Sequence, residues 1–156
     1  MNNIKIQLKL IFFFFIFTNI SNADLIKPSS NLDPLNVLMI QLNSLKDNNN
    51  PYKDAGIEQT WEFAHPFNKA STGPLERFKQ MIYSDSYKIL IGHENSKTII
   101  LKEAPNKLVY KVYVLSKDKK KYYYIWQIEK VKQEGKFKNC WMTTGVSDPI
   151  FVAEII

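Results

Sequence analysis

The 156-residue sequence is poor in the residues that build many kinds of functional site. It has one cysteine, Cys140, and two histidines, His65 and His93, with no C-x-x-C or H-E-x-x-H spacing. This set supplies too few ligands for a metal site of the zinc type. A single cysteine also leaves no internal disulfide, so packing alone must hold the fold together. We therefore expect no metal and no other cofactor.

Arginine is almost absent, since Arg77 is the only one among the 21 basic residues. Bidentate recognition of phosphate and guanine favours arginine over lysine. Although the formal net charge is +6, we therefore expect no nucleic-acid partner. The run of lysines at 119–121 is expected to lie at the solvated tip of a hairpin.

Long apolar runs are also scarce, and the one exception lies at the N-terminus. Lys5 and Lys9 precede an apolar run over residues 10–17, and a polar stretch then ends at Ala23. This pattern is typical of a signal peptide, and the run is shorter than the roughly 20 residues of a spanning helix. We expect cleavage after Ala23 and export to the cell exterior, a periplasm or an organelle lumen. The alternative is an uncleaved anchor, which would be the only expected contact with a membrane.

The remaining residues are the right number for one domain with a sizeable core. We expect a short N-terminal segment at 24–32, a single domain at 33–148 and a C-terminal tail at 149–156. Neither a repeat nor a low-complexity linker divides this region.

Three helices are predicted in the first half of the domain. The first opens at Asp33-Pro34 and the second at Asn50-Pro51, where a capping residue precedes proline. The second helix is expected to stop at His65-Pro66, and the third to open at Gly73-Pro74. Apolar residues at helical spacing form one stripe on each helix: Leu35, Leu38, Met39, Leu42 and Leu45; Ile57, Trp61 and Ala64; Leu75, Phe78 and Ile82.

After residue 86 the apolar pattern changes from helical to alternating. Five strands are predicted, at 87–93, 97–103, 107–117, 121–131 and 137–146. In the fourth strand Tyr122, Tyr124, Trp126 and Ile128 share one face, and Gln127 and Glu129 lie on the other. Short breaks between strands favour antiparallel connections. The sequence therefore predicts an α+β fold in which three N-terminal helices pack in a curved antiparallel sheet.

Five stretches carry a resemblance to a known family: DPLNVLMIQLNSLKDNN, WEFAHPFNKASTGPLERFKQMI, YKILIGH, IWQIEK and KNCWMTTGV. Together they resemble an uncharacterised exported or plastid-associated family, known only as a domain of unknown function. That family is similar in plan to the nuclear-transport-factor-2-like, cystatin-like superfamily, a cone made by a curved sheet wrapped on helices. The resemblance covers about 33–146 and implies the cone fold and an internal pocket. The superfamily includes isomerases, dehydratases and cyclases that act on apolar molecules, and also non-catalytic dimerisation modules.

Chemistry of the isomerase kind needs a carboxylate inside the cone as a proton shuttle. The predicted geometry places none there, because Glu129 lies on the opposite strand face and Glu58 and Glu62 flank a helix stripe toward water. A dehydratase-like mechanism would pair His65 or His93 with an aspartate, but no aspartate is suitably placed to orient either ring. The absence of a carboxylate favours a role other than catalysis.

The candidate site residues are aromatic or polar side chains expected near the pocket or its rim. His65 is expected to cap a helix C-terminus, where the dipole favours the protonated ring, and His93 to lie in a turn. Cys140 could act as a nucleophile beside a histidine, but burial as a small apolar side chain is the favoured interpretation. The aromatic members could line an apolar pocket or belong to the core. The full set is Trp61, His65, Asn68, His93, Tyr110, Trp126, Cys140 and Trp141.

The leading functional hypothesis is a non-enzymatic ligand-binding or protein-assembly module. The predicted outer sheet face is unusually apolar at Tyr113, Leu115, Tyr123 and Ile125, which favours a homodimer or another protein partner. The pocket favours a small apolar ligand. The alternative is an isomerase- or dehydratase-like enzyme that acts on such a molecule in the cone pocket.

Overall fold

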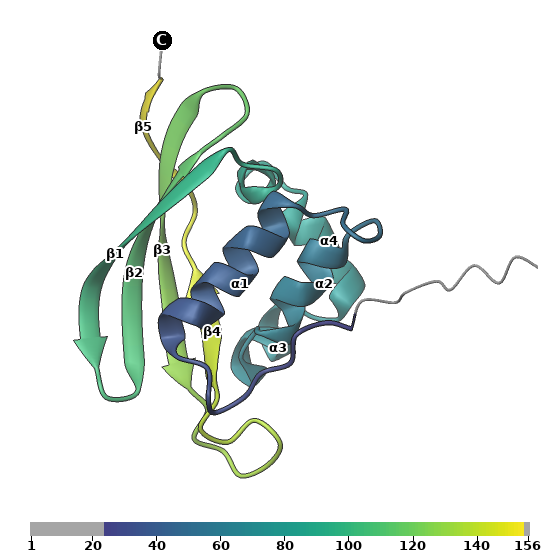
Figure 1. The fold of residues 1–156 in the computed structure, drawn as a ribbon, viewed down its shortest axis with the longest axis vertical. Coiled ribbons are helices and arrows are strands. Elements are labelled where there is room, and N and C mark those ends of the chain that lie inside the picture. The colour runs from purple at the N-terminus through teal and green to yellow at the C-terminus, as the bar shows by residue number, and fades with distance from the viewer. Residues whose placement is uncertain (1–23, 155–156) are drawn as a thin grey trace, which may run out of the picture.

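The computed structural model describes residues 24–154, so the expected signal segment at 1–23 lies outside the described part of the chain. Within that part, helices cover one face of an antiparallel five-stranded sheet (Figure 1), as the predicted α+β class requires. The helices are α1 (Pro34–Lys46), α2 (Ala55–Glu62), α3 (Pro66–Thr72), α4 (Leu75–Ile82) and the short 3-10 helix η1 (Lys88–Leu90). The strands are β1 (Asn95–Ala104), β2 (Lys107–Leu115), β3 (Lys120–Lys130), β4 (Trp141–Val146) and β5 (Ile150–Glu154).

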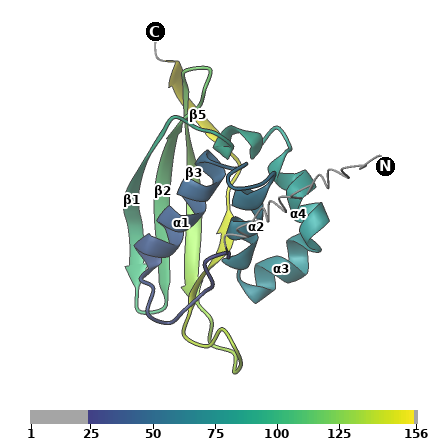
Figure 2. The same ribbon diagram turned by 45° about the vertical axis from the view of Figure 1, so that its right-hand side comes forward.

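Helix α1 begins where the sequence predicts it. The backbone N–H of Asn36 donates to Asp33 Oδ1 at 2.8 Å, and Pro34 occupies the first helical position. The apolar side of the helix is fully buried at Val37, Leu38, Leu42 and Leu45. This side packs between α2 and the sheet, where it forms the centre of the core (Figure 2).

The predicted number of helices is wrong, because Pro66 begins a helix rather than ending one. His65 is the N-cap of α3, and its Nδ1 accepts from the Phe67 N–H at 3.2 Å. A proline at the first helical position loses no hydrogen bond and has a suitable φ, so the residue before it can serve as a cap. The region of α2 and α3 therefore holds two helices instead of one.

The predicted starts of the later helices are also displaced. Helix α2 begins at Ala55 after an N-cap at Asp54, four residues beyond the expected Pro51. Gly73 closes α3, and α4 begins one residue later than predicted, with Pro74 as its N-cap.

The predicted strand at 87–93 is absent from the sheet. Its middle forms η1, and Gly92 has a φ of +65°, which an extended strand cannot contain. The Gly92 N–H donates to the Leu45 carbonyl at 2.9 Å, so this segment packs on the end of α1. The next four predicted strands correspond to β1 to β4, although β4 begins at Trp141 rather than at 137.

The expected C-terminal tail contains a fifth strand. Residues Ile150–Glu154 form β5, which pairs antiparallel with Lys120–Tyr123 of β3. Because β2 occupies the other edge of β3 from Lys121 to Glu129, β4 and β5 share one edge of that strand.

The face assignment within β3 is confirmed. Tyr124, Trp126 and Ile128 are buried under the helices, while Gln127 and Glu129 lie half-buried on the outer face. Tyr122, the fourth residue assigned to the inner face, is only half-buried. Strand order is β1-β2-β3-β4, with β5 beside β3. No helix in 24–154 is long and apolar enough to cross a bilayer.

Candidate functional site

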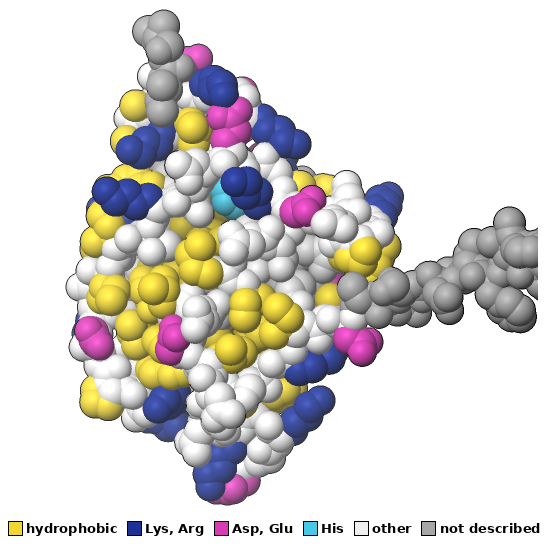
Figure 3. Space-filling view, viewed as in Figure 1, with side chains coloured by type: hydrophobic (Ala, Val, Ile, Leu, Met, Phe, Trp, Pro, Cys, Tyr) yellow, Lys and Arg dark blue, Asp and Glu magenta, His cyan; other side chains and the backbone are white. Residues whose placement is uncertain are grey.

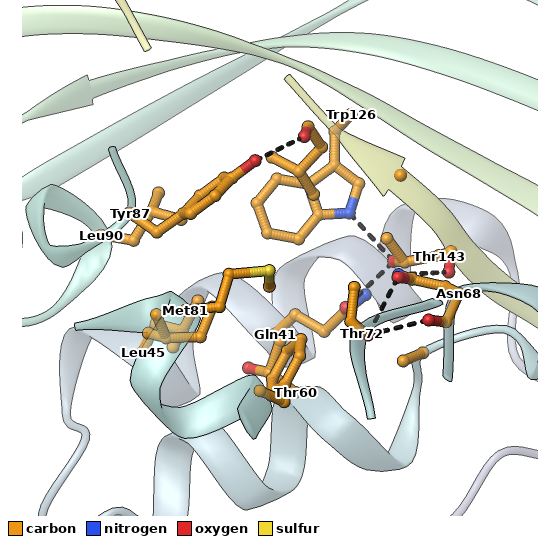
Figure 4. A pocket seen from close by; sticks show the side chains of 15 residues that line it. Gln41, Leu45, Thr60, Asn68, Thr72, Met81, Tyr87, Leu90, Trp126 and Thr143 are labelled. Carbon is orange, nitrogen blue, oxygen red and sulfur yellow. Dashed lines mark hydrogen bonds between the residues drawn. The ribbon is translucent and has the colours of Figure 1, made fainter. Parts of the chain in front are cut away.

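A cavity of about 240 Å³ lies between the helices and the inner face of β3 and β4 (Figure 4). Its apolar lining comes from α1, the segment after α2, α4, η1 with the residue before it, and both strands. It consists of Leu45, Ala64, Phe78, Met81, Ile82, Tyr87, Leu90, Trp126, Gly145 and Val146. Its polar lining consists of Gln41, Thr60, Asn68, Thr72 and Thr143. The cavity is smaller than typical sites for drug-sized ligands, which have volumes of about 300–1,000 Å³.

A buried hydrogen-bonded chain forms one wall of the cavity. Trp126 Nε1 donates to Thr143 Oγ1 at 2.9 Å, and the same hydroxyl donates to Gln41 Oε1 at 2.9 Å. Gln41 Nε2 then donates to the Val37 carbonyl at 3.0 Å. The chain connects β3, β4 and α1, so it fixes the position of all three elements around the cavity.

Asn68 and Thr72 extend this polar wall along α3. Asn68 Nδ2 donates to the Thr143 carbonyl at 3.2 Å, and Thr72 Oγ1 lies 2.8 Å from the Asn68 carbonyl. In Figure 4 these groups gather on one side of the cavity, while Met81, Tyr87 and Leu90 lie on the other. The cavity therefore has a polar side and an apolar side.

Solvent reaches the cavity from one direction. The half-buried lining residues come from α3, α4, the segment before η1 and the end of β4, and are Asn68, Thr72, Met81, Tyr87, Gly145 and Val146. The other lining residues are buried. A ligand would therefore enter between α3, α4 and β4.

The cavity lining is almost free of ionisable groups. None of its 15 residues is Asp, Glu, Lys, Arg, His or Cys. Tyr87 is the one ionisable residue among the 15, and burial raises the pKa of its phenol. The phenol O–H donates to the Val146 carbonyl at 3.0 Å. Near neutral pH the lining is therefore uncharged.

Two of the eight predicted site residues, Asn68 and Trp126, meet in this cavity. Tyr110 is a fully buried core residue outside it. Trp61 packs against the core with its ring 5.0 Å from that of Phe78 and does not line the cavity.

The structure contradicts the expected capping role of His65 at a helix C-terminus. As the N-cap of α3, His65 uses Nδ1 as an acceptor, which requires the unprotonated nitrogen. Burial lowers the pKa of its imidazole, against a weaker opposing effect of Glu129. His65 lies at the positively polarised N-terminus of α3, which favours the neutral imidazole. The sequence analysis expected a protonated ring at a helix C-terminus instead.

His93 occupies the turn that the sequence predicts for it. The ring is buried, and Nδ1 lies 2.8 Å from the Leu90 carbonyl. Burial lowers the pKa of this imidazole as well. His93 does not line the cavity, so its place is a hydrogen-bonded turn beside η1.

Cys140 and Trp141 lie away from the cavity. Cys140 packs with Val131 and Met142 in a small separate cluster, and burial raises the pKa of its thiol. This environment disfavours the thiolate that a nucleophile requires. Trp141 packs against the main core, with Lys130 Nζ 5.1 Å from its ring centroid.

The most important residues that the sequence interpretation missed are Gln41 and Thr143. Gln41 falls at position i+3 from Leu38 and i−4 from Leu45, on the apolar stripe of α1, and is fully buried. A polar residue within an apolar stripe indicates a buried hydrogen-bonded group, and this signal could have identified it.

No group of three or more His, Cys, Asp or Glu side chains in the described residues could hold a metal ion. Comparison with known proteins gave no match to a family model, a curated protein or a solved structure.

Proposed function

We propose that this protein is a non-enzymatic binding module that holds a small, neutral, mostly apolar molecule in the cavity between its helices and sheet. The observation that carries the proposal is the lining itself, in which Tyr87 is the only ionisable residue. A buried charge without a partner costs far more free energy than a buried neutral group. The lining therefore favours uncharged ligands over carboxylates and amines.

The polar wall indicates that the ligand carries one or two polar atoms. Thr60 Oγ1 donates to the Gly56 carbonyl and keeps its lone pairs as acceptors. Gln41 Nε2 and Asn68 Nδ2 each donate one hydrogen bond and have a second N–H. A hydroxyl, ether or carbonyl group on an apolar skeleton complements such a wall.

The same lining weighs against the enzyme alternative. Isomerases and dehydratases need a carboxylate or an imidazole within hydrogen-bonding reach of the substrate. His65 and His93 lie outside the cavity and hydrogen-bond to the protein backbone. Binding without turnover is therefore the function that the geometry supports best.

The proposal includes a finer description of the fold, the cone of the nuclear-transport-factor-2-like superfamily. Helices packed on the inner face of an antiparallel sheet, with a cavity between the two layers, support it. Export after cleavage at Ala23 is also part of the proposal, and N-terminal sequencing of the mature protein tests it.

Tryptophan fluorescence tests the binding proposal. The sequence has three tryptophans, and only Trp126 lines the cavity. A Trp61→Phe/Trp141→Phe variant leaves Trp126 as the sole reporter. Geraniol and geranate share one carbon skeleton, and we expect geraniol to shift the emission and to bind at least about tenfold tighter than the anion.

A matched pair of valine substitutions locates the binding site. Val146→Phe fills the mouth of the cavity and should abolish the response, whereas Val109→Phe on β2 should leave it unchanged. Equal binding of geranate, or no response to any member of a panel of neutral terpenoid alcohols, would contradict the proposal.

A further inference from the structure

The outer face of the sheet carries a regular array of lysines. All the helices in the described part of the chain lie on the opposite face (Figures 1 and 2). Strand register places one lysine in each of four successive rows across β1, β2 and β3. These residues, called here the outer lysines, are Lys97, Lys102, Lys111 and Lys121.

The outer lysines carry uncompensated charge. None of them forms an ion pair with another of the described residues. A fifth lysine on this face, Lys107, is neutralised by Glu129 at 2.8 Å. The face is therefore positively charged, and its partner should be anionic.

Two tyrosines hold outer lysines in place. Lys111 Nζ lies 4.5 Å from the ring centroid of Tyr123, and Lys121 Nζ lies 4.9 Å from that of Tyr113. These cation–π contacts keep the ammonium groups on the aromatic rings. The rings are thus occupied, which disfavours stacking with the bases of a single-stranded nucleic acid.

Apolar side chains separate the outer lysines. In the rows of the sheet, Lys121 lies opposite Leu115, and Lys111 lies between Ile99 and Ile125. Ile99 remains 44% exposed on the edge strand. Lysine and tyrosine interleaved with aliphatic side chains form the kind of surface that enters the headgroup region of a bilayer.

A second copy of the chain does not suit this face. In a two-fold symmetric dimer the same patch meets itself, so the outer lysines of both copies would be brought together. Like charges directly opposite each other are destabilising. The charge of the face therefore argues against the homodimer that its apolar residues alone suggest.

We propose that the outer face of the sheet docks on a membrane surface rich in anionic phospholipid. The outer lysines attract the headgroups, while Ile99, Leu115 and Ile125 contact the boundary between headgroups and acyl chains. Lysine suits this task, because attraction to a charged surface needs point charges rather than a bidentate fork. This docking goes beyond the proposed ligand binding, since the cavity opens on the other side of the sheet. It also differs from the sequence-based expectation that only residues 1–23 contact a membrane.

Vesicle co-sedimentation of the full chain tests the proposal. We would compare vesicles of phosphatidylcholine alone with vesicles that also contain phosphatidylglycerol, and measure the ratio of the two partition coefficients. In the variant Lys97→Gln/Lys102→Gln/Lys111→Gln/Lys121→Gln the ratio should fall at least about tenfold, because each lysine near an anionic surface contributes to binding. Added salt should lower the wild-type ratio by screening.

A matched variant controls for total charge. Lys53→Gln/Arg77→Gln/Lys117→Gln/Lys132→Gln removes four exposed charges, none of which lies in β1, β2 or β3, and should keep the wild-type ratio. Residues 1–23 are identical in all the variants. Any binding by these residues that does not depend on lipid charge affects both partition coefficients equally, so it cancels in their ratio. If the fourfold variant fails to fold, Lys97→Gln/Lys102→Gln on the edge strand gives a smaller loss in the same direction.

Several outcomes would overturn the proposal. A wild-type ratio near one would do so, as would equal losses in the two fourfold variants. Tighter binding of an acidic polypeptide or of single-stranded DNA, measured in parallel and lost in the same variant, would assign the face to another class of partner. A dimer that dissociates when Leu115 and Ile125 are replaced by serine would assign it to a second copy.

Discussion

The indole N–H of Trp126 and the hydroxyl of Thr143 form a buried hydrogen bond of 2.9 Å that joins β3 to β4. The same hydroxyl donates to Gln41 on α1, so a single oxygen atom connects three elements around the cavity. All three side chains are at most 3% exposed, so both hydrogen bonds are largely shielded from bulk water.

Thr143→Val should therefore be strongly destabilising. The substitution keeps the shape but leaves the Trp126 N–H and the Gln41 Oε1 without a partner, at a cost of about 2–4 kcal/mol in the free energy of unfolding. Urea titration measures the change. Thr143→Ser keeps the hydroxyl and should cost only about 1 kcal/mol, the value of one buried methyl group. Equal effects of the two substitutions would show that the hydroxyl is unimportant.

Gly56→Ala should destabilise the contact between α1 and α2. A Cβ at Gly56 would lie 1.9 Å from the Ser44 carbonyl oxygen, so the two helices would have to move apart. We expect a loss of at least about 2 kcal/mol in the free energy of unfolding, as for other overpacked sites. At Gly145 an added Cβ meets no atom within 4 Å, so Gly145→Ala should change stability by less than about 1 kcal/mol. Thermal or urea unfolding of the two variants should rank them in this order.

Because of its two buried histidines, the folded protein should lose stability in mild acid. Burial lowers the pKa of both His65 and His93, so the folded state favours the neutral rings while the unfolded state titrates near pH 6.5. Their contribution is fully present above about pH 6.5 and is lost as the pH falls through the folded-state values. Urea midpoints between about pH 8 and pH 5 should show the decline.

Substitution of each histidine isolates its share of this pH dependence. His65→Asn keeps an N-cap acceptor for α3, and His93→Gln keeps a polar side chain without a charge that titrates near neutral pH. Each variant should flatten the profile, and the double variant should flatten it most. A wild-type profile that is flat or rises toward pH 5 would count against this assignment.

Cys140 should be unreactive in the folded protein. Its thiol is buried, and burial raises its pKa, so little thiolate exists near neutral pH. Iodoacetamide labelling followed by mass spectrometry should be at least about a hundredfold slower in buffer than in concentrated urea. Rapid labelling of the native protein would instead indicate an accessible, activated thiol.

Much of the fold follows from local sequence patterns. The cap at Asp33, the proline after it and the apolar stripe of α1 define one helix without ambiguity. In β3 the two-residue spacing of Tyr124, Trp126 and Ile128, opposite in parity to Gln127 and Glu129, gives the buried face correctly. These elements were predictable because each depends on residues a few positions apart.

The errors arise where one local pattern suits two structures. Proline stops a preceding helix and also begins the next one, so Pro66 alone did not separate one long helix from two short ones. The run Ile89-Leu90-Ile91 has the composition of a strand, but Gly92 adopts a left-handed φ and the segment turns onto α1.

The candidate site was the least predictable part. Its polar wall joins Gln41 to Thr143, which are 102 positions apart in the sequence. Only the packing of α1 against β4 brings them together, and no spacing rule describes that contact. Of the expected site residues, Asn68 and Trp126 line the cavity, because each lies on an element that faces it.

The shared edge of β3 has a practical consequence. Ser147 bridges the gap between β4 and β5, since its backbone N–H donates to the Ile125 carbonyl and its Oγ accepts from the Ile125 N–H. Within the described residues the cavity lining ends at Val146. Epitope tags or fluorescent fusions attached beyond β5 should thus leave the cavity undisturbed.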